Sequence, residues 1–181
     1  MVTVPMRSLL VLILMALALS ARSDQAAKEP PLSERSRAQA LRVLAEALAD
    51  KAITQPQYEE ALAWVRASPC DGVDRALSPE RKRQLGRAIA RQEKLKKVDV
   101  YQSFSDAGWS IVYLGTQVSD NGYFFYAGDP LLAAKAVTVW GGAAMAFETT
   151  DIAKWVSLNV KGIPNRLAQC FAWHVTLNRD R

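Results

Sequence analysis

Histidine and cysteine, which build most metal centres and many active sites, are scarce in this chain. The 181 residues contain one histidine, His174, and two cysteines, Cys70 and Cys170. A structural zinc site needs several such ligands at short spacings, and no such spacing occurs. A Ser-His-Asp triad would have to use His174, yet no G-x-S-x-G motif offers the serine. We therefore expect His174 to be a structural or interface residue, and we expect no metal.

Glycine-rich phosphate-binding loops are missing as well. The chain has nine glycines, and its only adjacent pair is Gly141 and Gly142. Neither a P-loop nor a dinucleotide-binding motif can be formed from this pattern, because each needs several glycines at fixed offsets between a strand and a helix. We expect no nucleotide cofactor, and no other cofactor is indicated.

Long hydrophobic runs are limited to one, at the N-terminus. Arg7 precedes an apolar run from Ser8 to Ala21, which is shorter than the roughly 20 residues that span a bilayer. Small residues follow at the −3 and −1 positions that signal peptidase reads. We predict a signal peptide over residues 1–23 and a flexible tether over 24–32, with an uncleaved anchor as the alternative. The mature protein should be periplasmic or secreted and should have no transmembrane span.

Export determines how the two cysteines are interpreted. In an oxidising compartment an even pair is by default a disulfide, so we predict a Cys70–Cys170 bridge. A redox or catalytic thiol would need a C-x-x-C pair or an activating neighbour, and neither is visible. The chain also has no Asn-x-Ser/Thr sequence, which is consistent with a bacterial envelope protein.

Positive charge is local rather than general. The formal net charge is +5, and all of the excess lies before residue 100. Five cationic residues fall on one face of a predicted helix that begins at Ser78: Arg83, Arg87, Arg91, Lys94 and Lys97. This face is either an ordinary solvated surface or a site for anionic lipid, glycan or an acidic protein. Nucleic acid is not an expected partner, because the chain is exported and the remainder is neutral.

The region 33–97 is predicted to be helical. Ser33 is a candidate N-cap, and Thr54 with Gln57 fits a capping box at the start of a second amphipathic helix. Residues 36–67 resemble the helical hairpin of the short C-terminal domain (SHOCT) family, whose turn carries Ile-Thr followed by an aromatic residue. Ile53, Thr54 and Tyr58 carry this resemblance. The resemblance implies an association module and no catalytic residue.

The region 98–181 is predicted to be an antiparallel α+β domain. Short β-branched and aromatic runs are separated by turn residues, among them Asn121-Gly122, which favours a hairpin. We predict strands near 99–104, 109–116, 122–128, 136–142 and 144–149. A helix with Thr149 or Thr150 as its cap should follow, and Cys170–Thr176 should return as a final strand. Both strand faces are apolar, so we expect the 150–160 helix on one face and N-terminal helices over part of the other.

Aromatic residues on the sheet form either part of the core or an open contact surface. The candidates for an aromatic interface are Trp109, Tyr113, Tyr123 and Phe125. A Cys170–His174 nucleophile pair is excluded on a strand, because residues four apart are separated by about 13 Å. Glu148 is the least explained carboxylate and, with an aspartate, could serve a hydrolase.

These observations favour a non-catalytic, exported envelope protein that binds another protein, as an inhibitor or immunity protein does. One alternative is a binder of anionic envelope lipid or glycan through the basic helix. The other is a cell-wall hydrolase that uses carboxylates.

Overall fold

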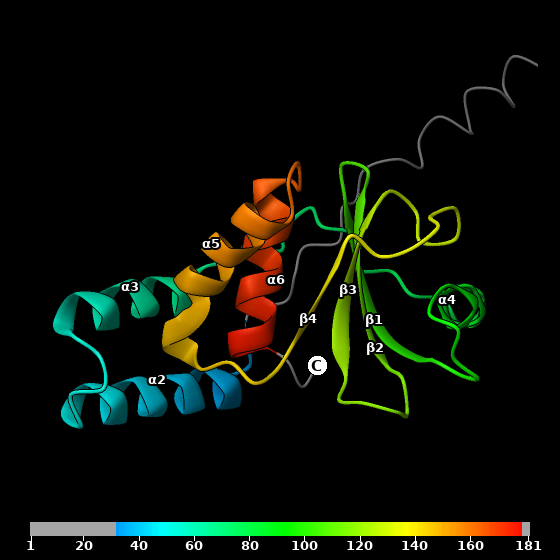
Figure 1. Cartoon of the computed structure of the whole chain (residues 1–181). Coiled ribbons are helices and arrows are strands. Elements are labelled where there is room, and N and C mark those ends of the chain that lie inside the picture. Colours follow the sequence, from blue (N-terminus) through cyan, green and yellow to red (C-terminus); the bar gives the residue numbers. More distant parts are fainter. Residues whose placement is uncertain (1–31, 179–181) are drawn as a thin grey trace, which may run out of the picture.

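An antiparallel sheet has one helix on one side and the other helices on the opposite side, so the predicted α+β class is confirmed (Figure 1). The computed structural model describes residues 32–178. In chain order the elements are α2 (Glu34–Ala49), α3 (Gln55–Arg66), α4 (Pro79–Gln92), β1 (Asp99–Asp106), β2 (Trp109–Gly115), β3 (Gly122–Ala127), β4 (Thr138–Gly141), the 3-10 helix η1 (Ala146–Glu148), α5 (Thr149–Asn159) and α6 (Asn165–Leu177). The predicted signal peptide and most of the predicted tether lie outside the described residues.

The N-terminal helices begin where the sequence predicts. The Ser33 hydroxyl accepts a hydrogen bond from the Ser36 N–H at 3.0 Å, which caps α2. Thr54 and Gln57 form the reciprocal capping box of α3, and Ser78 caps α4. Each cap supplies a partner for a backbone N–H that the first turn of a helix leaves unpaired.

The sheet is a meander in the order β1-β2-β3-β4, with every neighbouring pair antiparallel. Ile111 of β2 lies opposite Phe104 of β1 and Phe125 of β3, so these three side chains share one face. Val112, opposite Phe124, belongs to the other face. All five side chains are buried, which confirms that both faces of the sheet are covered.

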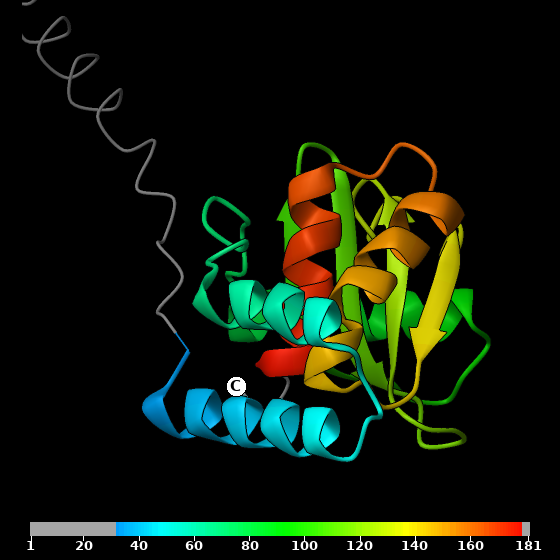
Figure 2. The same ribbon diagram turned by 90° about the vertical axis from the view of Figure 1, so that its left-hand side faces the viewer.

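Different helices cover the two faces. The face with Ile111 belongs to a core that includes side chains of α5 and α6. The hairpin of α2 and α3 packs on the outer side of those helices and forms a further layer (Figure 2). The other face is covered by α4, whose Leu85 and Ile89 have no exposed surface and contact Val112 and its neighbours. Of the N-terminal helices, α4 is therefore the one that covers this second face.

The predicted disulfide is confirmed. Cys70, in the segment after α3, is bonded to Cys170 of α6 across 100 positions of sequence. Both residues are buried, at 1% and 0% exposure. The bond fixes the end of the helical hairpin to the centre of the first core, on a helix rather than on the predicted strand.

The prediction of a final strand at Cys170–Thr176 is wrong, because these residues lie in the middle of α6. Every residue from Cys170 to Val175 is buried. A helix that is buried all round lacks the apolar stripe that identifies helices in sequence, and its Phe, Trp and Val residues favour a strand by propensity.

Two smaller predictions near residue 148 are also wrong. The expected strand over 144–149 is a loop followed by η1. Glu148, rather than a threonine, holds the N-cap position of α5 and makes no side-chain cap hydrogen bond there. The Thr149 hydroxyl instead donates to the Ala146 carbonyl at 3.1 Å and bonds the Thr176 hydroxyl at 2.8 Å, which ties η1 to α6.

The loop after β3 is fastened to α4 by an ion pair that predicts a pH dependence. Arg81 donates to Asp129 at 2.7 Å, and the Leu131 N–H donates to the same carboxylate at 2.8 Å. Burial raises the pKa of Asp129, but these two donors outweigh it and leave the pKa below its ordinary value. The contribution to stability is therefore present above the unfolded pKa of about 4 and is lost as the pH falls through the lower folded pKa.

We expect Asp129→Asn to flatten the decline in unfolding free energy between about pH 5 and pH 3 by up to about 1 kcal/mol, since the pair is partly exposed. Urea titrations across that range would measure it. Asp151→Asn is the matched control, because the Asp151 side chain is 77% exposed. Equal pH profiles for the Asp129 variant and the wild type would contradict the assignment.

Candidate functional site

A groove runs between α4 and the segment that leads into β1. It has a volume of about 520 Å³. We call it the α4–β1 groove and define it by its lining residues, which are Pro79, Lys82, Arg83, Gly86, Arg87, Ala90, Lys96, Lys97, Val98, Asp99 and Val100. Five of these eleven residues are cationic and one is acidic, so the groove is strongly positive.

The floor of the groove is formed by small and apolar residues, where the segment that leads into β1 approaches α4. Gly86 of α4 has no side chain, and a Cβ atom at its position would lie 3.1 Å from the Val98 carbonyl oxygen. A side chain at this position would therefore require the Val98 backbone to move by a few tenths of an ångström. Ala90, Val98 and Val100 complete an apolar surface that continues into the second core.

The cations of the groove extend into solvent above this floor. The side chains of Arg83, Arg87 and Lys97 are 61–64% exposed. Glu80 forms an ion pair with Arg83 and approaches Arg87 at 4.0 Å, while Asp99 accepts from Lys97 at 2.8 Å. Two carboxylates are too few to neutralise the cluster, so a positive field remains at the rim.

Two carboxylates of this cluster have pKa values lowered by their hydrogen-bond partners. The hydrogen bond and charge of Arg83 hold the pKa of Glu80 below its ordinary value. The hydrogen bonds from Lys97 and Gln117 do the same for the pKa of Asp99. Local hydrogen bonds therefore stabilise the ionised forms of these two carboxylates.

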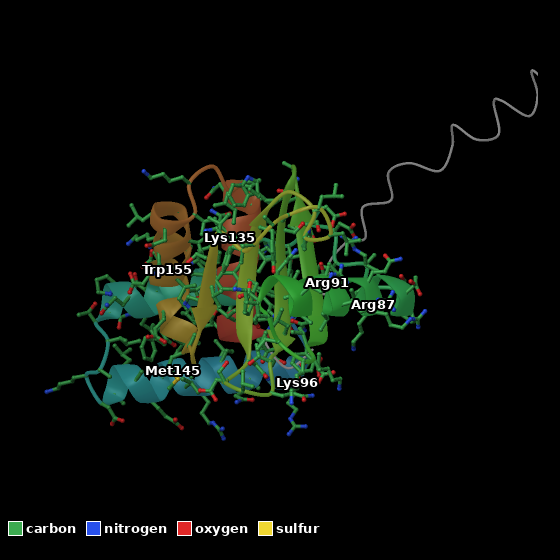
Figure 3. All side chains as sticks on the ribbon, turned by 45° about the vertical axis from the view of Figure 1, so that its right-hand side comes forward. Arg87, Arg91, Lys96, Lys135, Met145 and Trp155 are labelled. Carbon is green, nitrogen blue, oxygen red and sulfur yellow. A yellow bond between two sulfur atoms is a disulfide. The ribbon has the colours of Figure 1, made fainter. Side chains whose placement is uncertain are left out.

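The structure brings together only part of the predicted basic face. Arg83, Arg87 and Lys97 line the groove, whereas Arg91 and Lys94 do not. The helix ends at Gln92 and Lys94 has a positive φ of 55°, so the helical periodicity stops before Lys94 and Lys97. Figure 3 shows Arg87 and Arg91 on α4, with Lys96 toward the lower edge of the molecule.

Sequence reasoning missed Lys82 and Lys96 as members of the site. Lys82 lies next to Arg83 on the helix, and Lys96 lies next to Lys97 in the connecting segment. The sequence signal for Lys96 was the group of lysines that follows the helix, Lys94, Lys96 and Lys97. It would have pointed to the groove only if the strand had been expected to fold back against the flank of α4.

The proposed aromatic interface is not an open surface at its centre. Tyr123 and Phe125 are buried, at 1% and 0% exposure, in the core that includes α5 and α6. Trp109 and Tyr113 are half-buried and pack against the same core, where Tyr113 stacks on Tyr123 at 4.3 Å between ring centroids. These four residues are therefore packing residues in the described structure.

His174 and Cys170 lie one turn apart on α6, so the distance argument from a strand does not apply. The Cys170 sulfur is nevertheless bonded to Cys70 and is no thiolate. His174 has no exposed surface and lies against Phe104, at 4.8 Å between ring centroids. Both residues contribute to packing in the first core.

Glu148 stabilises a turn and lines neither of the two hollows described in this section. One of its carboxylate oxygens accepts a hydrogen bond from the Met145 N–H at 2.6 Å, which closes the turn of η1. Within residues 32–178, no group of three or more histidine, cysteine or acidic side chains is placed to hold a metal ion.

A second hollow, of about 590 Å³, lies between α2, the loop before η1 and the end of α6. Arg35 is the only charged residue among those that line it. This hollow therefore lacks the concentration of charge that distinguishes the α4–β1 groove.

Comparisons with known proteins give no family for this chain. No family model matches it, and neither a curated protein nor a solved structure matches it. Among residues 32–178, none of the helices has both the length and the apolar character needed to cross a bilayer.

Proposed function

We propose that this chain is a non-catalytic, exported binding protein that holds an acidic partner protein in the α4–β1 groove, as an inhibitor or immunity protein holds its target. The observation that carries the proposal is the gathering of five cationic residues around one apolar floor. The Cys70–Cys170 disulfide supports an oxidising compartment such as the periplasm or the extracellular space.

The chemistry of the groove suits recognition rather than catalysis. Exposed cations accelerate the encounter with a negatively charged partner, and they select against partners of the same sign. The apolar floor formed by Gly86, Ala90 and Val98 supplies area that a partner can bury, which slows dissociation. Both requirements of a specific complex are thus met in one place.

We expect the double variant Arg83→Glu with Arg87→Glu to lose the partner. The tagged mature chain would be used to capture proteins from an envelope extract of the source organism. The wild type should retain one stoichiometric protein, and the variant should retain at least about tenfold less, because two attractive charges become repulsive. Raising the salt from about 0.15 to 0.5 M should weaken capture, since the charges are exposed.

The matched control is Arg42→Glu with Lys154→Glu, which reverses two cations of similar or slightly greater exposure elsewhere. Their side chains are 72% and 69% exposed, and each lies at 3.9 or 4.0 Å from an acidic neighbour, as Arg87 does. The control should capture as the wild type does. Loss of capture in the control as well, or no stoichiometric protein with the wild type, would contradict the proposal.

A second candidate function is the binding of an anionic amphiphile from the envelope, and the apolar floor beneath the cationic rim favours it. A headgroup would contact residues such as Arg87 and Lys96, while an acyl chain would lie along the half-buried Gly86 and Ala90. Recovery of lipid or polysaccharide, with no stoichiometric protein, would favour this function over the first.

A further inference from the structure

Positive charge is concentrated on one side of the sheet. Helix α4 and the segment after it, residues 79–97, carry eight basic and two acidic side chains. The hairpin of α2 and α3, residues 33–67, lies on the other side of the sheet and carries five basic and five acidic side chains. A charge distribution of this kind draws an extended anionic surface to the α4 side of the molecule.

The α4–β1 groove does not use all the cations of this side. Arg91 and Lys94 lie at the C-terminal end of α4 and do not line the groove. Both are exposed, and within residues 32–178 neither side chain forms an ion pair. Glu93 is the one acidic residue between them, and it is half-buried. These two cations are therefore available to an anionic partner outside the groove.

A loop with an apolar tip is fastened to the same end of α4. The Gln92 side chain donates to the carbonyl oxygens of Pro130 and Ala133, at 2.8 and 2.7 Å. Leu131 packs against the second core beneath α4, whereas Leu132 is 89% exposed. The turn therefore holds Leu132 in solvent, between two residues that are bonded to the cationic end of the helix.

The same character continues from this loop into β4. Residues 130–147 contain no acidic residue, and their one charged residue, Lys135, is exposed. Val137 and Val139 are 51% and 47% exposed. Val139 lies opposite Phe124, so it belongs to the face of the sheet that α4 covers, and the loop lies on that side as well (Figure 1). Exposed aliphatic side chains thus accompany the cations on one side of the molecule.

We propose that this part of the surface docks the protein on an anionic phospholipid bilayer. We call it the docking patch and define it by four residues, Arg91, Lys94, Leu132 and Lys135. Leu132 inserts among the headgroups, and the three cations lie against the phosphates. Interfacial binding scales with the apolar area that is buried and with the attraction of cations to anionic lipid, and the patch supplies both. None of the four residues lines the α4–β1 groove, so docking is independent of the proposed function.

The shape of the docking patch favours a lipid surface over a folded partner. Leu132 stands at the tip of a turn and lines neither of the two hollows described above. A folded partner would need a preformed pocket for this side chain, whereas the interfacial region of a bilayer accepts it without one. A second copy of the chain is also disfavoured, because two docking patches carry like charge.

Co-sedimentation of the mature chain with vesicles tests the proposal. Vesicles of phosphatidylcholine with about 30% phosphatidylglycerol provide the anionic surface, and vesicles of phosphatidylcholine alone are the neutral comparison. We expect binding to the anionic vesicles and little to the neutral ones. Raising the salt from about 0.15 to 0.5 M should weaken the binding, because the cations of the patch are exposed.

Two variants test the two components of the patch, and each has a matched control. Leu132→Ser should bind the anionic vesicles about tenfold more weakly, because it removes the inserted apolar side chain. Leu158→Ser should bind as the wild type does, since Leu158 is 76% exposed but lies on α5, on the other side of the sheet.

Reversal of charge in the patch, by Arg91→Glu with Lys94→Glu, should weaken the binding at least about tenfold. The control that reverses Arg42 and Lys154 should change it by less than about threefold. Those two cations lie on α2 and α5, and charges farther from the bilayer than about 10 Å are screened.

Three results would overturn the proposal. The first is the absence of binding to the anionic vesicles. The second is equal binding by Leu132→Ser and the wild type, which would mean that Leu132 does not insert. The third is binding that Arg83→Glu with Arg87→Glu abolishes while Leu132→Ser leaves it unchanged, which would place the lipid in the groove. If the vesicles do not bind and Leu132→Ser loses the protein captured from the extract, the patch belongs to a protein interface instead.

Discussion

Loss of the Cys70–Cys170 disulfide is expected to lower the free energy of unfolding by about 4 kcal/mol. The bond closes a loop across 100 positions, and in the chain-entropy model a loop of that length restricts the unfolded chain by about 4–5 kcal/mol. Typical domains are stable by only about 5–15 kcal/mol, so the loss is a large share of the total. Urea unfolding of Cys70→Ala with Cys170→Ala would measure it.

Alanine is the suitable replacement because both cysteines are buried, and a serine would bury an unpaired hydroxyl. The wild type in excess reductant provides an independent comparison and should lose a similar amount. The folded structure should persist in both, since the bond acts mainly on the unfolded state. A decrease below about 1 kcal/mol in both experiments would contradict this account.

The sheet was predictable because its local signals agree with its tertiary environment. In β2 the alternate residues Ile111 and Val112 face opposite cores, and both are apolar as a two-sided sheet requires. Turn residues before Gly122 separate β2 from β3 as expected. When the strand propensity and alternation of a segment agree with its burial in the fold, its structure can be predicted from its sequence.

The last helix was not predictable for the opposite reason. The α6 residues from Cys170 to Val175 are buried on every side, so polar residues do not mark a solvent face. Without a helical periodicity of apolar residues, a prediction depends on the intrinsic propensities of the residues alone. Phe171, Trp173 and Val175 have high strand propensity, so they favour a strand. The surrounding helices and the sheet override that preference by burying the segment as a helix.

The candidate site was half predictable. A helical wheel identifies Arg83 and Arg87, because the helix is regular there. The rest of the groove depends on where the chain turns after Gln92, and the wheel carries no information beyond that point. Lys82 and Lys96 enter the site through the approach of β1 to Gly86, which is a tertiary contact.

Replacement of Phe171 by alanine is expected to lower the free energy of unfolding by about 3–5 kcal/mol, the range for buried phenylalanine. The ring has no exposed surface and contacts Tyr123, Phe125 and Trp140 edge-on, at 5.0–5.5 Å between centroids. It therefore joins α6 to β3 and β4, and its removal leaves a cavity where helix and sheet meet. Urea unfolding with the disulfide intact would measure the change.

Two comparisons separate packing from other effects. Phe171→Leu keeps most of the apolar volume, so it should lose less than Phe171→Ala. Leu158→Ala, on α5, removes a side chain that is 76% exposed and should change stability by less than about 0.5 kcal/mol. Because the α4–β1 groove belongs to the opposite face of the sheet, the folded fraction of Phe171→Ala should still capture the partner protein of the proposed function. Loss of capture in that folded fraction would mean that the two faces are coupled through the sheet.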